Sequence, residues 1–133
     1  MRWVRNHSLS VLACCIAALA LAGCHRSPRA PTDRTTCYRV VAGPSNATRL
    51  VPLAYADANI ETCASHLEAR RLIEHRDLIG AYAGLYIFVG AGQITAADAL
   101  DGQRYRLIAP GQRKDLDAAI RDLMTNSASA GQH

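Results

Sequence analysis

A short basic segment and a run of apolar residues open the chain, and together they decide how much of the sequence is left to fold. Arg2 and Arg5 precede an apolar run from Leu9 to Ala22 that only Ser10 interrupts. This order of charge and apolarity is typical of a secretory signal. The run is shorter than the roughly 20 apolar residues that a membrane-spanning helix needs. The fold must therefore be built from the residues that follow.

The residues at the end of the apolar run carry a motif. Leu21-Ala22-Gly23-Cys24 resembles the lipobox of bacterial lipoproteins, in which an aliphatic residue and two small residues precede a cysteine. The resemblance implies that residues 1–23 are a cleaved signal peptide, and that Cys24 is lipidated and attaches the chain to a membrane. Val11-Leu12-Ala13-Cys14 is a rival of the same residue types, but it would leave only about six apolar residues before the cut. An uncleaved anchor is the other alternative.

The residue after the lipidated cysteine indicates in which membrane a lipoprotein is retained. Cys24 is followed by His25 rather than by aspartate. In lipoproteins of Gram-negative bacteria, the absence of aspartate at this place implies sorting to the outer membrane. The resemblance therefore predicts a chain held on the periplasmic face of the outer membrane.

The composition changes again after the cysteine. Residues 24–36 contain two prolines, three arginines and almost no large apolar side chain, which predicts a lipidated N-terminus and a flexible linker. Fully extended, the linker would reach at most about 40 Å. Its arginines offer contacts with anionic headgroups, although a solvated linker is the simpler interpretation. Residues 37–124 are expected to form a single periplasmic domain, and residues 125–133 a disordered tail.

Apolar periodicity within 37–124 predicts the elements of the domain. Strands are expected over Tyr38–Ala42, Leu50–Tyr55, Tyr82–Val89, Gln93–Ala97 and Arg104–Ile108, and helices over Ile60–Arg71 and Lys114–Met124. Asn59 is the expected N-cap of the first helix, on which Ile60, Cys63, Ala64 and Leu67 are expected to form one apolar stripe. Pro52 favours an edge position or a bulge for the second strand. The order predicts an α+β fold, with an antiparallel sheet of about five strands and two helices on one face.

Five cysteines divide between the parts of the chain. Cys14 and Cys15 leave with the signal peptide, and Cys24 is used by the lipid. Cys37 and Cys63 remain, and an exported protein is exposed to oxidising conditions, so a disulfide between them is predicted. Two independent buried thiols are the alternative.

Charge excludes one class of partner. The formal net charge of +4 comes from the signal peptide and the linker, because residues 37–133 carry ten basic and ten acidic side chains. A neutral domain gives no support to nucleic-acid binding.

Catalytic and metal motifs are not found in the sequence. Cys63, His66 and His75 offer too few ligands within reach for zinc, and Gly90-Ala91-Gly92 is a turn rather than a dinucleotide fingerprint. No Walker loop, nucleophile elbow or H-E-x-x-H motif is present. We therefore expect no catalytic residues, no metal and no cofactor.

Tyrosines and arginines on the predicted strands form the candidate binding face, because these two residue types dominate binding hot spots. The face comprises Tyr38, Arg39, Tyr82, Tyr86, Arg104, Tyr105 and Arg106. Tyrosines packed at the rim of a small sheet are the alternative. The first functional hypothesis is a non-catalytic lipoprotein that docks on an envelope protein. The second is a ligand-binding or inhibitor lipoprotein that recognises cell-wall glycan or a lytic enzyme.

Overall fold

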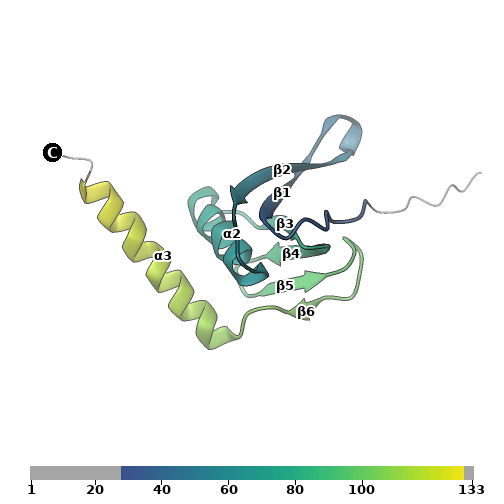
Figure 1. Cartoon of the computed structure of the whole chain (residues 1–133). Coiled ribbons are helices and arrows are strands. Elements are labelled where there is room, and N and C mark those ends of the chain that lie inside the picture. The colour runs from purple at the N-terminus through teal and green to yellow at the C-terminus, as the bar shows by residue number, and fades with distance from the viewer. Residues whose placement is uncertain (1–27, 131–133) are drawn as a thin grey trace, which may run out of the picture.

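A computed structural model describes residues 28–130, which form one antiparallel sheet and two helices (Figure 1). The predicted α+β arrangement is confirmed, with six strands in place of about five. The predicted signal peptide 1–23, the lipidation site Cys24 and residues 131–133 of the predicted tail lie outside the described residues.

The strands follow the order β2-β1-β3-β4-β5-β6, and every neighbouring pair is antiparallel. Their bounds are β1 (Thr36–Ala42), β2 (Thr48–Tyr55), β3 (Leu78–Tyr82), β4 (Leu85–Val89), β5 (Ile94–Ala97) and β6 (Tyr105–Arg106), and a short 3₁₀ turn η2 (Pro44–Asn46) joins the first two. Pro52 lies in β2 at the edge of the sheet, where a missing amide donor breaks no inner ladder.

The strand predicted over Tyr82–Val89 is wrong as a single element. A two-residue turn at Ala83 and Gly84 divides it into the end of β3 and the whole of β4. Both turn residues have positive φ, 51° and 84°, as the tight turns of hairpins require. The error arises because the alternation of side chains continues across the turn, and because both strands are apolar on both faces.

The first long helix, α2 (Ile60–Glu74), begins as predicted. The side chain of Asn59 accepts a hydrogen bond from the amide of Thr62 at 2.8 Å and caps the helix. Its predicted apolar stripe is confirmed, because Cys63, Ala64 and Leu67 are fully buried. The helix runs three residues beyond the predicted end at Arg71 and stops at His75, which adopts a left-handed conformation.

The second long helix, α3 (Pro110–Ala130), is longer at both ends than the predicted Lys114–Met124. Proline fits the first turn of a helix because its missing amide would have no partner there. The helix continues through 125–130, within the segment predicted as disordered. In that part the hydroxyls of Thr125, Ser127 and Ser129 donate to carbonyls four residues earlier. Serine and threonine within helices commonly bond to the preceding turn in this way.

Residues 28–34 do not form the flexible linker that the sequence predicts. We call this segment the strap, because it crosses the β3–β4 turn and packs on the sheet. The amides of Ala83 and Gly84 donate to the carbonyls of Asp33 and Pro31, and Ala30 is buried. The side chain of Asp33 also accepts from Thr35. The domain therefore begins near residue 28 rather than at Cys37.

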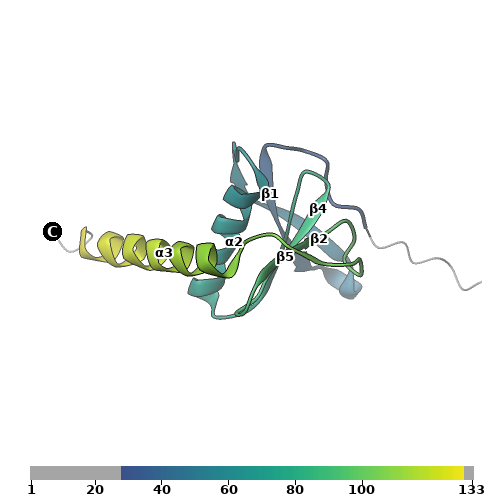
Figure 2. The ribbon, with the colours of Figure 1, turned by 90° about the horizontal axis from the view of Figure 1, so that it is seen from below.

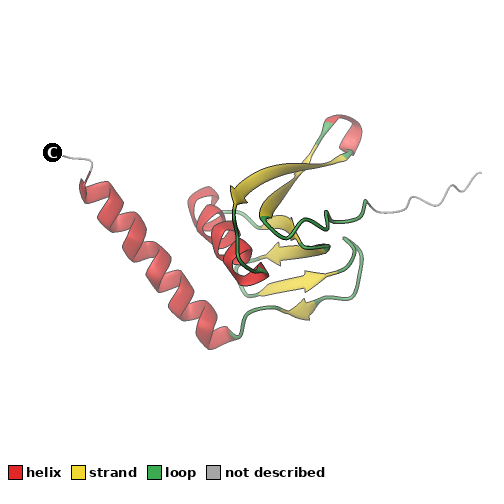
Figure 3. Ribbon diagram, in the orientation of Figure 1, coloured by secondary structure: helices red, strands yellow, loops and turns green. Residues whose placement is uncertain are grey.

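Two apolar clusters hold the sheet, one on each face. On one face, α2 packs against β1, β3 and β4, and α3 lies on the outer side of α2 (Figure 3). On the other face, where no helix of residues 28–130 lies, Ala30 of the strap packs with Ala81, Tyr86, Phe88 and Ala97. Two views at right angles place the start of the strap and the far end of α3 at opposite ends of the domain (Figures 1 and 2).

Candidate functional site

The seven residues of the predicted binding face do not share one surface. The register places Tyr38 and Tyr86 on the helix-free face, whereas Arg39 and Tyr82 point to the α2 side. Tyr82 is 3% exposed and Tyr86 is fully buried. Only Arg104, Tyr105 and Arg106 are exposed. The single Tyr–Arg face predicted from the sequence is therefore wrong.

The two buried tyrosines hold the strap in place. The hydroxyl of Tyr86 donates to the carbonyl of Pro28, and the hydroxyl of Tyr82 contacts the carbonyls of Arg34 and Asp57. Burial raises the pKa of the Tyr86 phenol. Each tyrosine buries its ring and satisfies its hydroxyl on the backbone, as buried tyrosines commonly do. These side chains serve the fold and offer no surface to a partner.

Arg39 is committed to an ion-pair cluster with the end of α2. Its guanidinium binds both carboxylate oxygens of Glu74 at 2.8 Å, and Arg70 and Arg76 bind the same carboxylate. Hydrogen bonds from Arg76, Arg70 and Arg39 lower the pKa of Glu74 to about 2. This cluster fastens β1 to α2, so Arg39 is a structural residue.

Two members of the predicted face line hollows: Arg39 borders one of about 420 Å³, and Arg104 borders a larger one. The guanidinium carbon of Arg104 lies 3.7 Å from the centre of the Phe88 ring, a cation–π contact. The larger cavity holds about 650 Å³ on the helix-free side of β3, β4 and β5. Asp77 and the turn 90–93 line its other side. Cavities of this size accept small molecules.

A further hollow lies between α2 and α3. It holds about 580 Å³, and its lining is mostly apolar. The residues lining it are Ser65, His66, Ala69, Leu116, Ala119, Ile120, Leu123, Met124 and Ser127. Leu123 is 67% exposed and Met124 is 40% exposed. We call this hollow the α2–α3 groove.

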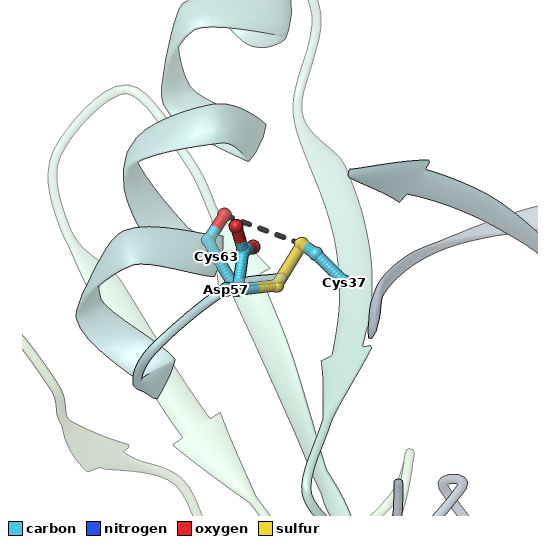
Figure 4. A group of neighbouring side chains, drawn as sticks. All are labelled: Cys37, Asp57 and Cys63. Carbon is cyan, nitrogen blue, oxygen red and sulfur yellow. Dashed lines mark hydrogen bonds between the residues drawn. A yellow bond between two sulfur atoms is a disulfide. The ribbon is translucent and has the colours of Figure 1, made fainter. Parts of the chain in front are cut away.

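The predicted disulfide between Cys37 and Cys63 is confirmed, and it joins the start of β1 to α2 in the core (Figure 4). The buried carboxylate of Asp57 lies beside it, within 4.8 Å of both sulfurs, and Nδ1 of His66 is 3.2 Å from that carboxylate. Cys37 Sγ also lies 3.5 Å from the carbonyl oxygen of Cys63; a disulfide sulfur carries no proton, so this is a contact only. Bonded to each other, the two sulfurs offer no thiolate to a metal.

Sequence reasoning missed Asp57, the cavity beside Arg104 and the α2–α3 groove. Asp57 carries no local signal, because it meets the cysteines only through the fold. The groove has a signal that could have been found: Leu116, Ile120, Leu123 and Ser127 follow spacings of four, three and four residues, and the helix was expected to end at Met124.

Comparisons with family models, curated proteins and solved structures give no match to this chain. Among residues 28–130, neither helix has the length and apolarity needed to cross a bilayer.

Proposed function

We propose that this chain is a bacterial lipoprotein, attached through Cys24 to the periplasmic face of the outer membrane, and that it docks on an envelope protein through the α2–α3 groove. The lipobox-like residues support the anchor. The observation that supports docking is an apolar stripe on α3 that continues beyond the region where α2 covers it.

The stripe is covered over only part of its length. Ile120 is 8% exposed and Leu116 packs on the core, whereas Leu123 is largely exposed. All side chains from Arg121 to Ser129 are exposed. The last turns of α3 are rich in serine and threonine, which are poor helix formers, and short helices in water depend on packing for stability. A partner on the stripe would supply that packing.

The partner that fits best is an amphipathic helix of another envelope protein. The groove is bounded by two helices, and a third helix can lay its apolar face between them. Charged residues of both signs flank the stripe, including Lys114, Asp117, Arg121 and Asp122, so the groove selects a partner by apolar contact rather than by net charge.

The position of the strap indicates which end of the domain would lie near the membrane. Only four peptide steps separate Cys24 from Pro28, so the chain between them spans at most about 15 Å. A lipid on Cys24 would hold the strap end of the domain close to the bilayer, and α3 would project from the opposite end (Figure 1). The groove would then face the periplasm, where a partner can reach it.

The anchor is tested by the mass of the full chain expressed in a Gram-negative host. We expect the wild type to lose residues 1–23 and gain a lipid, and Cys24→Ser to gain none. Cys14→Ser is the matched control and should behave as the wild type. Lipid retained by Cys24→Ser would contradict the proposed anchor.

Docking is tested by photo-crosslinking in intact envelopes. A photoreactive residue at Met124 should crosslink to an envelope protein, and the crosslinked peptide should carry apolar residues at helical spacing. Leu123→Glu should abolish the crosslink, whereas a photoreactive residue at Ser45, on the β1–β2 turn, should not form it. Crosslinks only to a second copy of this chain or to lipid would contradict the proposed partner.

A further inference from the structure

The floor of the cavity beside Arg104 is one row of side chains across three strands. Ile79 of β3 is opposite Phe88 of β4, and Phe88 is opposite Thr95 of β5. All three line the cavity on the helix-free face. The floor therefore combines an aromatic ring, an aliphatic side chain and one hydroxyl, with little exposed area at Phe88 or Thr95.

Two opposite charges stand on the rim of this floor. Arg104 and Asp77 both line the cavity, and they are not paired with each other. Within residues 28–130, Asp77 accepts no hydrogen bond and forms no close ion pair, although its charge acts through space on Arg71 of α2. The contact of Arg104 is the Phe88 ring. The ring covers one face of the guanidinium and leaves its N–H groups available.

Asp77 lies close to the 90–93 turn, and this places its carboxylate on the side of the cavity that the turn lines. A Cβ added at Gly90 would lie 3.3 Å from Oδ2 of Asp77. The carboxylate therefore stands against the backbone of the 90–93 turn, whereas Arg104 reaches the cavity from the segment before β6.

We propose that this cavity binds a short zwitterionic ligand, namely an amino acid or a small peptide with free ends. The ligand carboxylate pairs with Arg104, its ammonium group pairs with Asp77, and its apolar part lies on Ile79. The site is separate from the α2–α3 groove and does not depend on docking there.

The chemistry of the rim favours a ligand with both charges over a simple anion or cation. A simple anion would pair with Arg104 and place its charge in a cavity that also holds the Asp77 carboxylate. A zwitterion satisfies both groups and brings no net charge. The volume of about 650 Å³ exceeds the space that a single ion needs and suits an amino acid or a small peptide.

The test is an NMR titration of the full chain in detergent micelles with the dipeptide alanyl-leucine. We expect shifts of the backbone amides of Phe88, Gly90 and Thr95, and none at Leu123 in the other groove. Acetylating the dipeptide removes the ammonium charge, and amidating it removes the carboxylate. Each change should weaken binding by about tenfold, as losing one charged hydrogen bond does.

Two variants assign the two contacts. Asp77→Asn should bind the free and the acetylated dipeptide equally, and Arg104→Gln should bind the free and the amidated dipeptide equally. Arg104→Lys keeps the charge and should retain part of the affinity. Arg106→Gln removes a neighbouring exposed cation outside the cavity and should change nothing. No shift at the three amides, or an equal loss with Arg106→Gln, would overturn the proposal.

Discussion

Arg113 of α3 and Glu68 of α2 form a buried ion pair in which the guanidinium nitrogen lies 2.9 Å from the carboxylate oxygen. Glu68 is fully buried and also binds Arg71 through two hydrogen bonds of 2.8 Å. The same Glu68 contact raises the pKa of Arg71. Arg113 donates in addition to the carbonyl of Gly90. The carboxylate of Glu68 therefore pairs with an arginine of each helix and fixes the position of the start of α3 against α2.

Removing the charge of Glu68 is expected to be costly. Glu68→Gln removes the close carboxylate partner of Arg71 and leaves Arg113 with Asp117 alone. Breaking a buried ion pair on one side costs about 3–5 kcal/mol. Urea unfolding should show this loss of unfolding free energy. Glu61→Gln, on the exposed first turn of the same helix, is the control and should cost less than about 1 kcal/mol. A Glu68→Gln variant as stable as this control would show that the pair does not hold the helices.

The disulfide is expected to supply a large share of the stability. Cys37 and Cys63 are 26 residues apart, and closing a loop of this length contributes roughly 3.5 kcal/mol in the chain-entropy model. The double variant with serine at both positions should lose about this much in urea unfolding. Mass measurement without reductant checks the bond itself, because two free thiols in the native protein would disprove it.

Gly80 is expected to tolerate no side chain. A Cβ at this position would run into Leu67 of α2 and lie 2.8 Å from the carbonyl oxygen of Tyr38. Gly80→Ala should therefore lower the free energy of unfolding by about 1–3 kcal/mol or more, through overpacking between sheet and helix. At Gly92 an added Cβ would meet nothing within 4 Å, so Gly92→Ala should leave thermal unfolding almost unchanged. Equal melting temperatures for the two variants would contradict this account.

Acid should weaken the link between β1 and α2. The pKa of Glu74 is lowered to about 2, so its carboxylate stabilises the fold above its usual pKa near 4.5, and this stabilisation is lost as the pH falls from about 4.5 toward 2. Glu74→Gln should flatten the pH dependence of unfolding in this window. Asp33, whose pKa is also lowered to about 2 by hydrogen bonds from Thr36 and Thr35, should leave a smaller residual dependence. An unchanged pH profile in Glu74→Gln would contradict the role of the cluster.

The hydroxyl of Tyr86 should control access to the strap. Tyr86→Phe removes the bond to the carbonyl of Pro28, which contributes about 1 kcal/mol. The strap should open more often, and trypsin should cleave after Arg29 and Arg34 faster than in the wild type. Tyr105→Phe changes an exposed hydroxyl and serves as the control. Cleavage at equal rates in both variants would mean that the bond does not hold the strap.

The sequence was most informative where the signal is local. The cap at Asn59, the stripe of Cys63, Ala64 and Leu67, and the edge position of Pro52 all follow from neighbours along the chain. The disulfide could be predicted because two cysteines remain once the predicted signal peptide and lipidation site are set aside, and a chain with such a signal is expected to meet oxidising conditions. In each case the structure agrees.

The sequence was misleading where distant contacts decide. Residues 28–34 have the composition of a linker, and they are ordered by Tyr82, Tyr86 and the turn at Ala83, none of which is near them in sequence. The tyrosines themselves were expected at a surface, because their residue type does not reveal which face of a twisted sheet they take. Of the predicted binding face, Arg104 alone lines the cavity, and its opposite charge, Asp77, could not be chosen without the register of β3 and β4.

The strap has a mechanical consequence. A pull on the N-terminal end of the domain first loads the few bonds between the strap and the β3–β4 turn, which can peel away one at a time. Peeling stops at Cys37, because the covalent bond to Cys63 carries the load into α2. From α2 the load passes through Glu68 and Arg113 into α3. The hydrogen bonds of the strap would therefore open under a small force, before the disulfide and the ion pair of Glu68 with Arg113 are loaded.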